Sequence, residues 1–247
     1  MNRTTHLALR DGIIADCSGA LYLEASETLL IADAHLGYAW AQRRRGELGP
    51  ITDGGIVDRL RSALDRWNPG CIVFLGDVVH RGRPSSEERH VIETALHEAA
   101  GRARLVAVLG NHDRNFESDF GNLNIESCDH WENADILAVH GDRDWPDTKK
   151  WLVLGHLHPA ISLEDSAGAT RRLPVFMESA RALVLPAFSP FAAGFNLHKA
   201  LPREWQQLFC EGYATLSATT GKQVRRLPRP FQMRFRPPGL DASPQQG

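Results

Sequence analysis

Five short apolar runs, each followed at once by a polar turn, constrain the fold of this chain more than any other feature. The runs are Leu29–Ala32, Cys71–Leu75, Leu105–Leu109, Ile136–Val139 and Trp151–Leu154. An apolar run of this length that ends at a turn is typical of a buried strand. Because open α/β sheets place ligands at the carboxyl ends of such strands, we expect the five turns to meet at one edge.

The turns carry side chains that bind metals or move protons. In chain order these are Asp33, His35, Asp77, Asn111, His112, Asp113, His140, His156 and His158. Gly110 precedes the Asn111-His112-Asp113 stretch and allows the chain to turn sharply there. Any one of these stretches alone could be an ordinary polar turn, but the five together favour a metal site.

The donor types indicate which metals would bind. Carboxylate, imidazole and amide ligands without cysteine suit manganese, iron or zinc, and they do not suit calcium or a thiolate zinc site. The candidate ligands are too many for one ion and about right for two, provided that one carboxylate bridges; they are Asp33, His35, Asp77, Asn111, His140, His156 and His158. Two metals ~3.5–4 Å apart are the usual device for in-line displacement at phosphorus, and they activate a shared water.

Composition excludes several other classes of protein. Apolar residues make up 43% and charged residues 23% of the 247-residue chain, which is typical of a globular protein. The net charge of −2 gives no general basic field, so nucleic-acid binding would need a local patch. The four cysteines form no CxxC pair, which argues against a zinc finger or a disulfide framework. Without a signal peptide or an apolar stretch of membrane length, we expect a cytoplasmic protein with no membrane contact.

The spacing of apolar residues predicts helices between the first three strands. One is expected over residues 53–67 with Asp53 as its N-cap, and a second begins at Pro84-Ser85-Ser86. Residues 38–52 read as a long polar connection. The order strand, helix, strand, helix, strand favours a partly parallel sheet. Strands with few helices between them follow residue 130 and predict a second, mixed or antiparallel sheet; they lie near residues 135–139, 151–155, 173–178 and 181–185.

As a set, the motifs resemble those of the calcineurin-like metallophosphoesterases, in the same order and over about residues 30–160. The resemblance implies an α/β fold that is a four-layer α/β/β/α sandwich with two mixed β-sheets. It implies one metal held by Asp33, His35, Asp77 and His158, and another held by Asp77, Asn111, His140 and His156. Asp77 would bridge the two ions. His112 would donate a proton to the leaving oxygen and would be oriented by Asp113 or Asp77.

One position departs from the pattern of the protein phosphatases in this family. They carry Gly-Asp-x-x-Asp-Arg-Gly, and this chain has His80 in place of the second aspartate, which counts against a phosphoprotein phosphatase. Arg81 fits the pattern and is expected to bind the substrate phosphate through two hydrogen bonds. The alternative is that Arg81 is an ordinary arginine of a surface loop.

A narrower resemblance is to the small SbcD-related (PdeM-like) phosphoesterases. It rests on Gly37-Tyr38, Arg45-Gly46, the Gly155–Ala160 stretch and the Leu-Pro-Ala-Phe segment at 185–188. Some bacterial members are associated with a DNA ligase and a helicase. This implies a two-metal phosphodiesterase, expected to use manganese, that cleaves DNA or RNA in DNA repair. A small-molecule phosphodiesterase or pyrophosphatase acting on cyclic nucleotides or nucleotide derivatives is the alternative, and retained ligands argue against an inactive scaffold.

The composition of the chain changes near its carboxyl terminus. We expect residues 1–227 to form the metallophosphoesterase domain, closed by a hairpin over 213–227, and residues 228–247 to form a Pro/Arg-rich tail that is partly disordered. Six cations and no acid lie between residues 212 and 240, with Phe231 and Phe235 among them. Arginines beside aromatic rings are typical of single-strand binding, whereas a solvated hairpin edge with a loose tail is the alternative.

Overall fold

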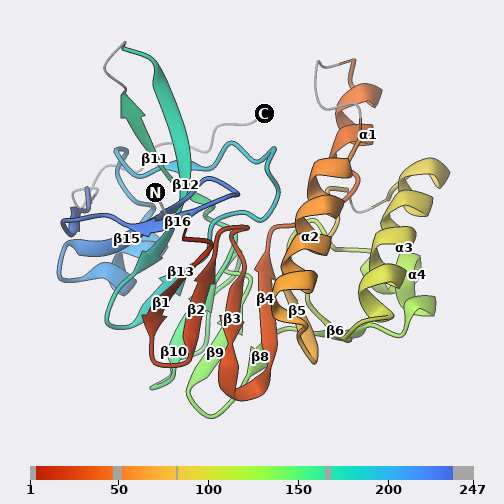
Figure 1. Ribbon diagram of the computed structural model, residues 1–247, viewed down its shortest axis with the longest axis horizontal. Helices are drawn as coiled ribbons and strands as arrows, with labels where there is room; N and C mark the ends of the chain where they lie inside the picture. Colours follow the sequence, from red (N-terminus) through yellow and green to blue (C-terminus); the bar gives the residue numbers. More distant parts are fainter. Residues whose placement is uncertain (1–3, 47–51, 82, 165–167, 236–247) are drawn as a thin grey trace.

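The computed structural model describes residues 4–46, 52–81, 83–164 and 168–235. Figure 1 shows two β-sheets packed against each other, with the long helices beside the first sheet. The expected α/β fold with two mixed sheets is confirmed. No helix of the described ranges is long and apolar enough to cross a membrane.

The first sheet contains strands β1 to β7 in sequential order. The first four strands pair antiparallel, and β4 to β7 pair parallel. Their bounds are β1 His6–Arg10, β2 Ile13–Asp16, β3 Leu21–Leu23, β4 Thr28–Ala32, β5 Cys71–Leu75, β6 Arg104–Val108 and β7 Glu126–Cys128. The parallel connections carry the helices, namely α1 Tyr38–Arg44, α2 Gly54–Trp67, α3 Ser86–Ala100 and α4 Phe116–Phe120.

The second sheet has the order β14-β11-β12-β13-β10-β9-β8, with β15 on β12 and both β16 and β17 on β15. Strands β9, β10 and β13 are parallel neighbours. The bounds are β8 Trp131–Glu132, β9 Ile136–Val139, β10 Trp151–Leu154, β11 Pro159–Glu164, β12 Thr170–Glu178, β13 Ala182–Val184, β14 Phe195–Asn196, β15 Tyr213–Thr219, β16 Val224–Arg226 and β17 Phe231–Gln232. The short helix α5 spans Arg203–Gln206, and 3-10 turns span Glu24–Ser26, Gly121–Leu123 and Gln207–Phe209.

Alternation along the central strands explains why their apolar runs are continuous. In β5, Ile72 and Phe74 pack with the helices, whereas Val73 and Leu75 pack between the two sheets. Both faces of this strand are buried, so every position must be apolar. A third cluster covers the outer face of the second sheet, where Trp205 of α5 packs. The layers therefore run helices, first sheet and second sheet, and the short helix α5 with the 3-10 turn that follows it lies on the outer face of the second sheet.

Residues 38–44 form helix α1, and the expectation of a polar connection over 38–52 is wrong for this part. The Asp53 carboxylate accepts hydrogen bonds from the amides of Gly37 and Ala39, both at 2.9 Å. Ala39 and Ala41 are buried. Asp53 does hold the N-cap position of α2, yet its side chain makes no cap bond there. Its carboxylate instead stabilises the start of α1, and residues 47–51 lie outside the described ranges.

The closing hairpin is confirmed as β15 and β16. Beyond it, strand β17 pairs with β15, and Met233 is buried. The amide of Leu201 donates to the carbonyl of Arg234 at 2.8 Å. The part of the expected tail between residues 228 and 235 therefore lies on the second sheet, and residues 236–247 lie outside the described ranges.

Candidate metal centre

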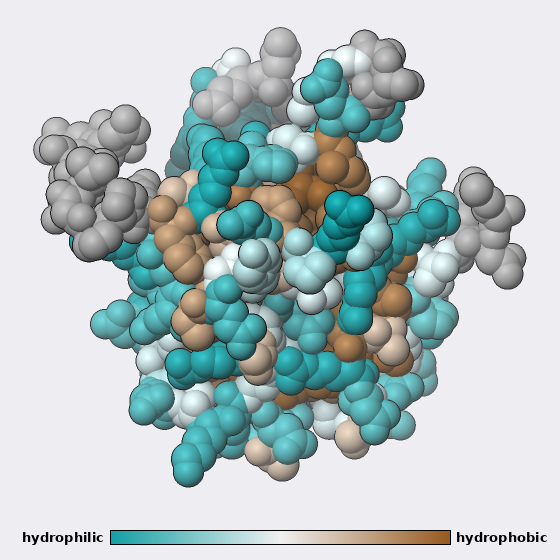
Figure 2. Space-filling model, turned by 90° about the vertical axis from the view of Figure 1, so that its left-hand side faces the viewer, coloured by the Kyte–Doolittle hydropathy of each residue, from teal (hydrophilic) through white to brown (hydrophobic). Residues whose placement is uncertain are grey.

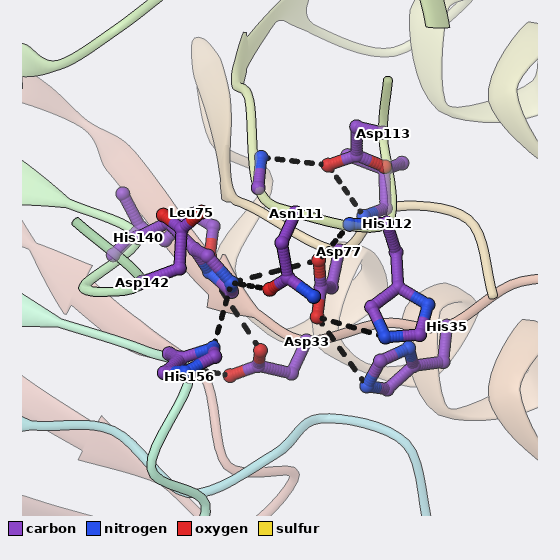
Figure 3. A network of polar contacts seen from close by, with 12 residues as sticks. Asp33, His35, Leu75, Asp77, Asn111, His112, Asp113, His140, Asp142 and His156 are labelled. Atoms are coloured by element: carbon purple, nitrogen blue, oxygen red, sulfur yellow. Dashed lines mark hydrogen bonds and ion pairs between the residues drawn. The ribbon is translucent and has the colours of Figure 1, made fainter. Parts of the chain in front are cut away.

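The loops that follow β4, β5, β6, β9 and β10 meet at one edge of the two sheets. Figure 3 shows the side chains that these loops direct toward a common space, from both sheets. The sequence-predicted ligands that it labels there are Asp33, His35, Asp77, Asn111, His140 and His156. The remaining one, His158, joins them through its contact with Asp33.

Asp33, His35 and His158 form one group whose donor atoms all lie within 4.8 Å of one another. Asp33 Oδ1 and His158 Nε2 lie 3.0 Å apart as an ion pair without hydrogen-bond geometry, and neither of these buried atoms has a hydrogen-bond partner. His35 Nε2 lies 4.0 Å from Asp77 Oδ2. Buried polar atoms without partners are costly unless a ligand satisfies them, so this group fits a cation.

Asp77, His140 and His156 form a second such group. His140 Nε2 lies 3.2 Å from His156 Nδ1 and 3.5 Å from Asp77 Oδ1. The Asn111 Oδ1 atom lies 3.3 Å from the same His140 nitrogen. Ligands that each lie about 2.1 Å from one ion are about 3.0–3.4 Å apart, so these spacings fit a shared ion.

Hydrogen bonds outside the two groups fix the orientation of the ligands. His140 Nδ1 lies 3.0 Å from the carbonyl oxygen of Leu75, which leaves Nε2 for a metal. Asp33 Oδ2 accepts from the amide of His156 at 2.9 Å, and Asp77 Oδ1 accepts from the amide of His112 at 3.0 Å. Each carboxylate is thereby anchored through one oxygen.

The backbone of the ligand loops is unusual. Five of the predicted ligands have φ in the left-handed region, namely Asp33 at 56°, His35 at 48°, Asp77 at 49°, His156 at 60° and His158 at 49°. This region is unfavourable for residues with a Cβ atom, and it persists where surrounding structure enforces it. Here it turns the side chains toward the common space directly after straight strands.

Two motif glycines provide the room in which these side chains meet. A Cβ atom on Gly76 would lie 2.2 Å from the His140 ring, and one on Gly110 would lie 2.5 Å from Asp77 Oδ1. Real Cβ atoms do not approach other atoms so closely, and any other residue would displace a ligand. Packing therefore requires glycine at positions 76 and 110.

Burial sets the protonation of several groups in the centre. It lowers the pKa of His35 to about 3 and also lowers the pKa of His156. Both rings are therefore neutral near neutral pH, the form that binds metals. Burial raises the pKa of Asp77. For Asp33, the neighbouring imidazoles, His158 first, outweigh the effect of burial and lower its pKa.

The expected proton donor His112 lies beside the two groups. Its Nδ1 is 2.7 Å from the carbonyl oxygen of His80, and its Nε2 is 4.0 Å from Asp77 Oδ2. The sequence predicted that Asp113 or Asp77 orients this ring, and the carboxylate of Asp113 contacts backbone amides instead. Its carboxylate is buried and accepts from the amides of Gly110, Val78 and Val79 at 3.0, 3.3 and 3.2 Å. Asp113 thus joins two ligand loops, and burial raises its pKa to about 6.

A cavity of about 340 Å³ opens over the metal ligands. His80 lines it together with Tyr38 and Phe191, and these three residues were not predicted as site residues. Burial lowers the pKa of His80 to about 4, and its Nδ1 is buried without a partner. Arg81 is half-buried and, within the described ranges, does not line this cavity. Only the departure from the phosphatase pattern marked His80 in the sequence.

The chain is similar to known proteins in sequence and in fold. A family model described as calcineurin-like phosphoesterase matches residues 27–185. The solved structure of the Pseudomonas putida nuclease MPE is 23% identical, covers 92% of this chain and 100% of its own, and gives a TM-score of 0.70. The E. coli phosphoesterase YfcE is 14% identical over 84% of this chain and 99% of its own, with a TM-score of 0.42. No curated protein sequence gives a significant match.

Proposed function

Because this chain belongs to the calcineurin-like phosphoesterase family, we propose that it is a two-metal phosphodiesterase that cleaves nucleic acid. Membership makes it a metal-dependent phosphoesterase, and members of the family use a binuclear metal centre. The observation that carries the proposal is the pair of ligand groups, Asp33/His35/His158 and Asp77/His140/His156, with Asp77 between them. Asn111 completes the second group.

Two divalent ions in these groups would activate a water and neutralise charge on the scissile phosphate. The protein's own contribution is to position the reacting groups. His112 Nε2 faces the centre while His80 holds the other ring nitrogen through its carbonyl, so Nε2 is placed to protonate the leaving oxygen. Manganese is the metal that we propose, with iron or zinc as alternatives, because the donors are carboxylate, imidazole and amide.

Charge at the rim supports a polyanionic substrate. Arg45 and Arg81 are close enough to the His80 ring to lower its pKa, after the larger effects of burial and of His112. Arginines beside the cavity suit the phosphates that flank a scissile bond. The nuclease from P. putida has the same fold, which supports the choice of nucleic acid. We extend the proposal to DNA repair, with a DNA ligase or helicase as partner, on the resemblance of the sequence motifs alone.

A small-molecule substrate is the second candidate, and the size of the cavity favours it. A volume of about 340 Å³ lies within the range of sites for ligands such as a mononucleotide. Cyclic nucleotides or nucleotide derivatives would then be the substrates.

A substrate panel with added manganese tests the proposal. We expect hydrolysis of single-stranded DNA or RNA, compared with duplex DNA, cyclic nucleotides and a chromogenic bis-ester. Asp77→Asn should abolish activity and reduce bound metal, because Asp77 lies between both groups. Asp142→Asn is the matched control, since Asp142 lies beside the centre but in neither group. Two tightly bound ions in Asp77→Asn would contradict the assignment, and cleavage of cyclic nucleotides alone would favour the second candidate.

A further inference from the structure

Three aromatic side chains line one side of the cavity over the metal ligands; we call Tyr38, His80 and Phe191 the aromatic wall. The rings of Tyr38 and Phe191 are stacked, with centroids 5.5 Å apart and planes 19° from parallel. The His80 ring meets Tyr38 edge-on at 4.7 Å. Ala192 and Ala193 continue the lining with small side chains, which leave space beside the rings.

The segment that carries Phe191 is fastened to the metal-binding loops at both ends. The amide of Ser189 donates to the carbonyl of Asp33 at 3.2 Å, and the amide of Phe195 donates to the carbonyl of His158 at 2.8 Å. Arg172 Nη1 donates to the carbonyl of Ala193 at 3.1 Å. Phe191 therefore has a fixed position relative to the ligands Asp33 and His158.

Two phenylalanines of this segment have different surroundings. Phe188 is 1% exposed and packs in the core beneath the first sheet's helices. Phe191, three residues later, is only half-buried and lines the cavity. The Tyr38 hydroxyl accepts a hydrogen bond from Gln42 Nε2 at 2.6 Å, which fixes its ring. The aromatic wall is thus an ordered aromatic surface within the site.

We propose that the aromatic wall binds the nucleobase next to the scissile phosphate by stacking on the ring of Phe191, which Tyr38 supports on its other face. The proposal rests on the proposed function and deepens it by naming which part of the substrate the apolar side of the cavity receives. Stacking accepts every base, because each has a flat π-face, so it would bind without strong sequence preference. An ordered ring loses little entropy on binding, which favours such a contact.

Equilibrium binding tests this proposal without depending on turnover. Thymidine 5′-monophosphate and 2-deoxyribose 5-phosphate carry the same phosphate and sugar, and only the first has a base. We expect calorimetry with the manganese-loaded protein to show about tenfold tighter binding of the mononucleotide, a typical effect of one base–aromatic stack. Phe191→Leu, which keeps an apolar side chain but removes the ring, should reduce this ratio to about one.

The matched control is Tyr213→Leu, which changes an exposed tyrosine (52% exposed) of strand β15 and should keep the full ratio. Metal content and melting temperature identify variants that have lost the fold, and Tyr38→Leu provides a second route to the same result. Equal affinities of the two phosphates in the wild type, or equal weakening of both in Phe191→Leu, would overturn the proposal. If the mononucleotide binds about tenfold more tightly than the sugar phosphate but the protein cleaves no nucleic acid, the nuclease function alone is refuted. If the protein binds neither the mononucleotide nor the sugar phosphate, both the base-stacking proposal and the nuclease function are refuted.

Discussion

At the scale of single residues, the support of His112 differs from what the motifs suggest. A backbone carbonyl, that of His80, lies against Nδ1, while Asp113 joins two loops through three backbone amides. A carbonyl oxygen only accepts, so it holds the ring with a hydrogen on Nδ1 and adds no full negative charge on that side. The ring keeps its orientation, and in its doubly protonated form it carries on Nε2 the proton that the leaving oxygen receives.

We expect His112→Ala to keep both metals and to slow hydrolysis by ~10²–10⁴, the usual contribution of a positioned general acid. The loss should be large for a nucleotide diester, whose alkoxide leaves poorly, and small for a nitrophenyl ester. Steady-state rates on the two substrates provide the measurement. An equal loss on both would remove His112 from the role of proton donor.

A substitution of Gly76 tests the packing of the second ligand group, Asp77/His140/His156. Its φ of 71° and the 2.2 Å approach of an added Cβ to the His140 ring leave no room for alanine. Gly76→Ala should lower the stability of the metal-free protein by about 1–3 kcal/mol, the cost of overpacking, and should weaken metal binding. Urea unfolding and metal analysis measure the two effects. Gly121→Ala is the control, because nothing lies within 4 Å of its added Cβ; similar losses in both variants would refute the explanation.

At the scale of secondary-structure elements, helix α1 depends on a residue outside itself. Asp53→Ala would leave the amides of Gly37 and Ala39 buried without an acceptor. We expect the free energy of unfolding to fall by about 1–3 kcal/mol, measured by urea titration. Asp58→Ala changes an exposed acid of α2 (75% exposed side chain) and should cost much less. Equal costs would show that the carboxylate of Asp53 does not support α1.

The same helix shows what a sequence can and cannot predict. The five apolar strands were predictable because burial on both faces demands unbroken apolar runs, as in Cys71–Leu75. Helix α1 was missed because residues 38–44 contain two arginines and only one short apolar stripe. The carboxylate that accepts from the amides at the start of this helix belongs to Asp53, which lies well after the helix in sequence. Strand β11 was missed because it begins at Pro159, and proline in a sequence counts against a strand.

The candidate site shows the same division. The predicted ligands converge because their strands run parallel and end at one edge. The carbonyl of His80 and the three amides bound by Asp113 belong to the backbone, whose position no side-chain pattern specifies. Phe191 lies at the cavity because its segment forms hydrogen bonds to the loops of Asp33 and His158, and these contacts join distant parts of the chain.

At the scale of the whole molecule, the distribution of charge matters more than the net charge of −2. Figure 2 shows the side of the molecule that Figure 1 has on its left, where hydrophilic residues cover most of the surface and hydrophobic areas lie between them. Arg229 and Arg234 are exposed on either side of β17. Deleting everything from residue 228 would also remove buried Met233, so such a truncation would confuse binding with folding.

Point substitutions give a cleaner test of this basic segment. If Arg229 and Arg234 contact phosphates, replacing both by alanine should weaken binding to single-stranded DNA and should reduce the slope of log K against log salt by about 0.7 per contact. Arg102→Ala with Arg104→Ala makes the same change in net charge and is the control. Identical slopes in both double variants would show that the segment is not a nucleic-acid site.

The ligand groups have one more consequence, because each takes residues from both sheets. Asp33 and His35 follow β4, and their partner His158 follows β10; Asp77 follows β5, and its partners follow β9 and β10. Bound ions would therefore link the first sheet to the second. An ion present at a hundred times its dissociation constant stabilises the folded state by about 2.7 kcal/mol. The metal supply of the cell would then govern how long each molecule survives degradation as well as how fast it works.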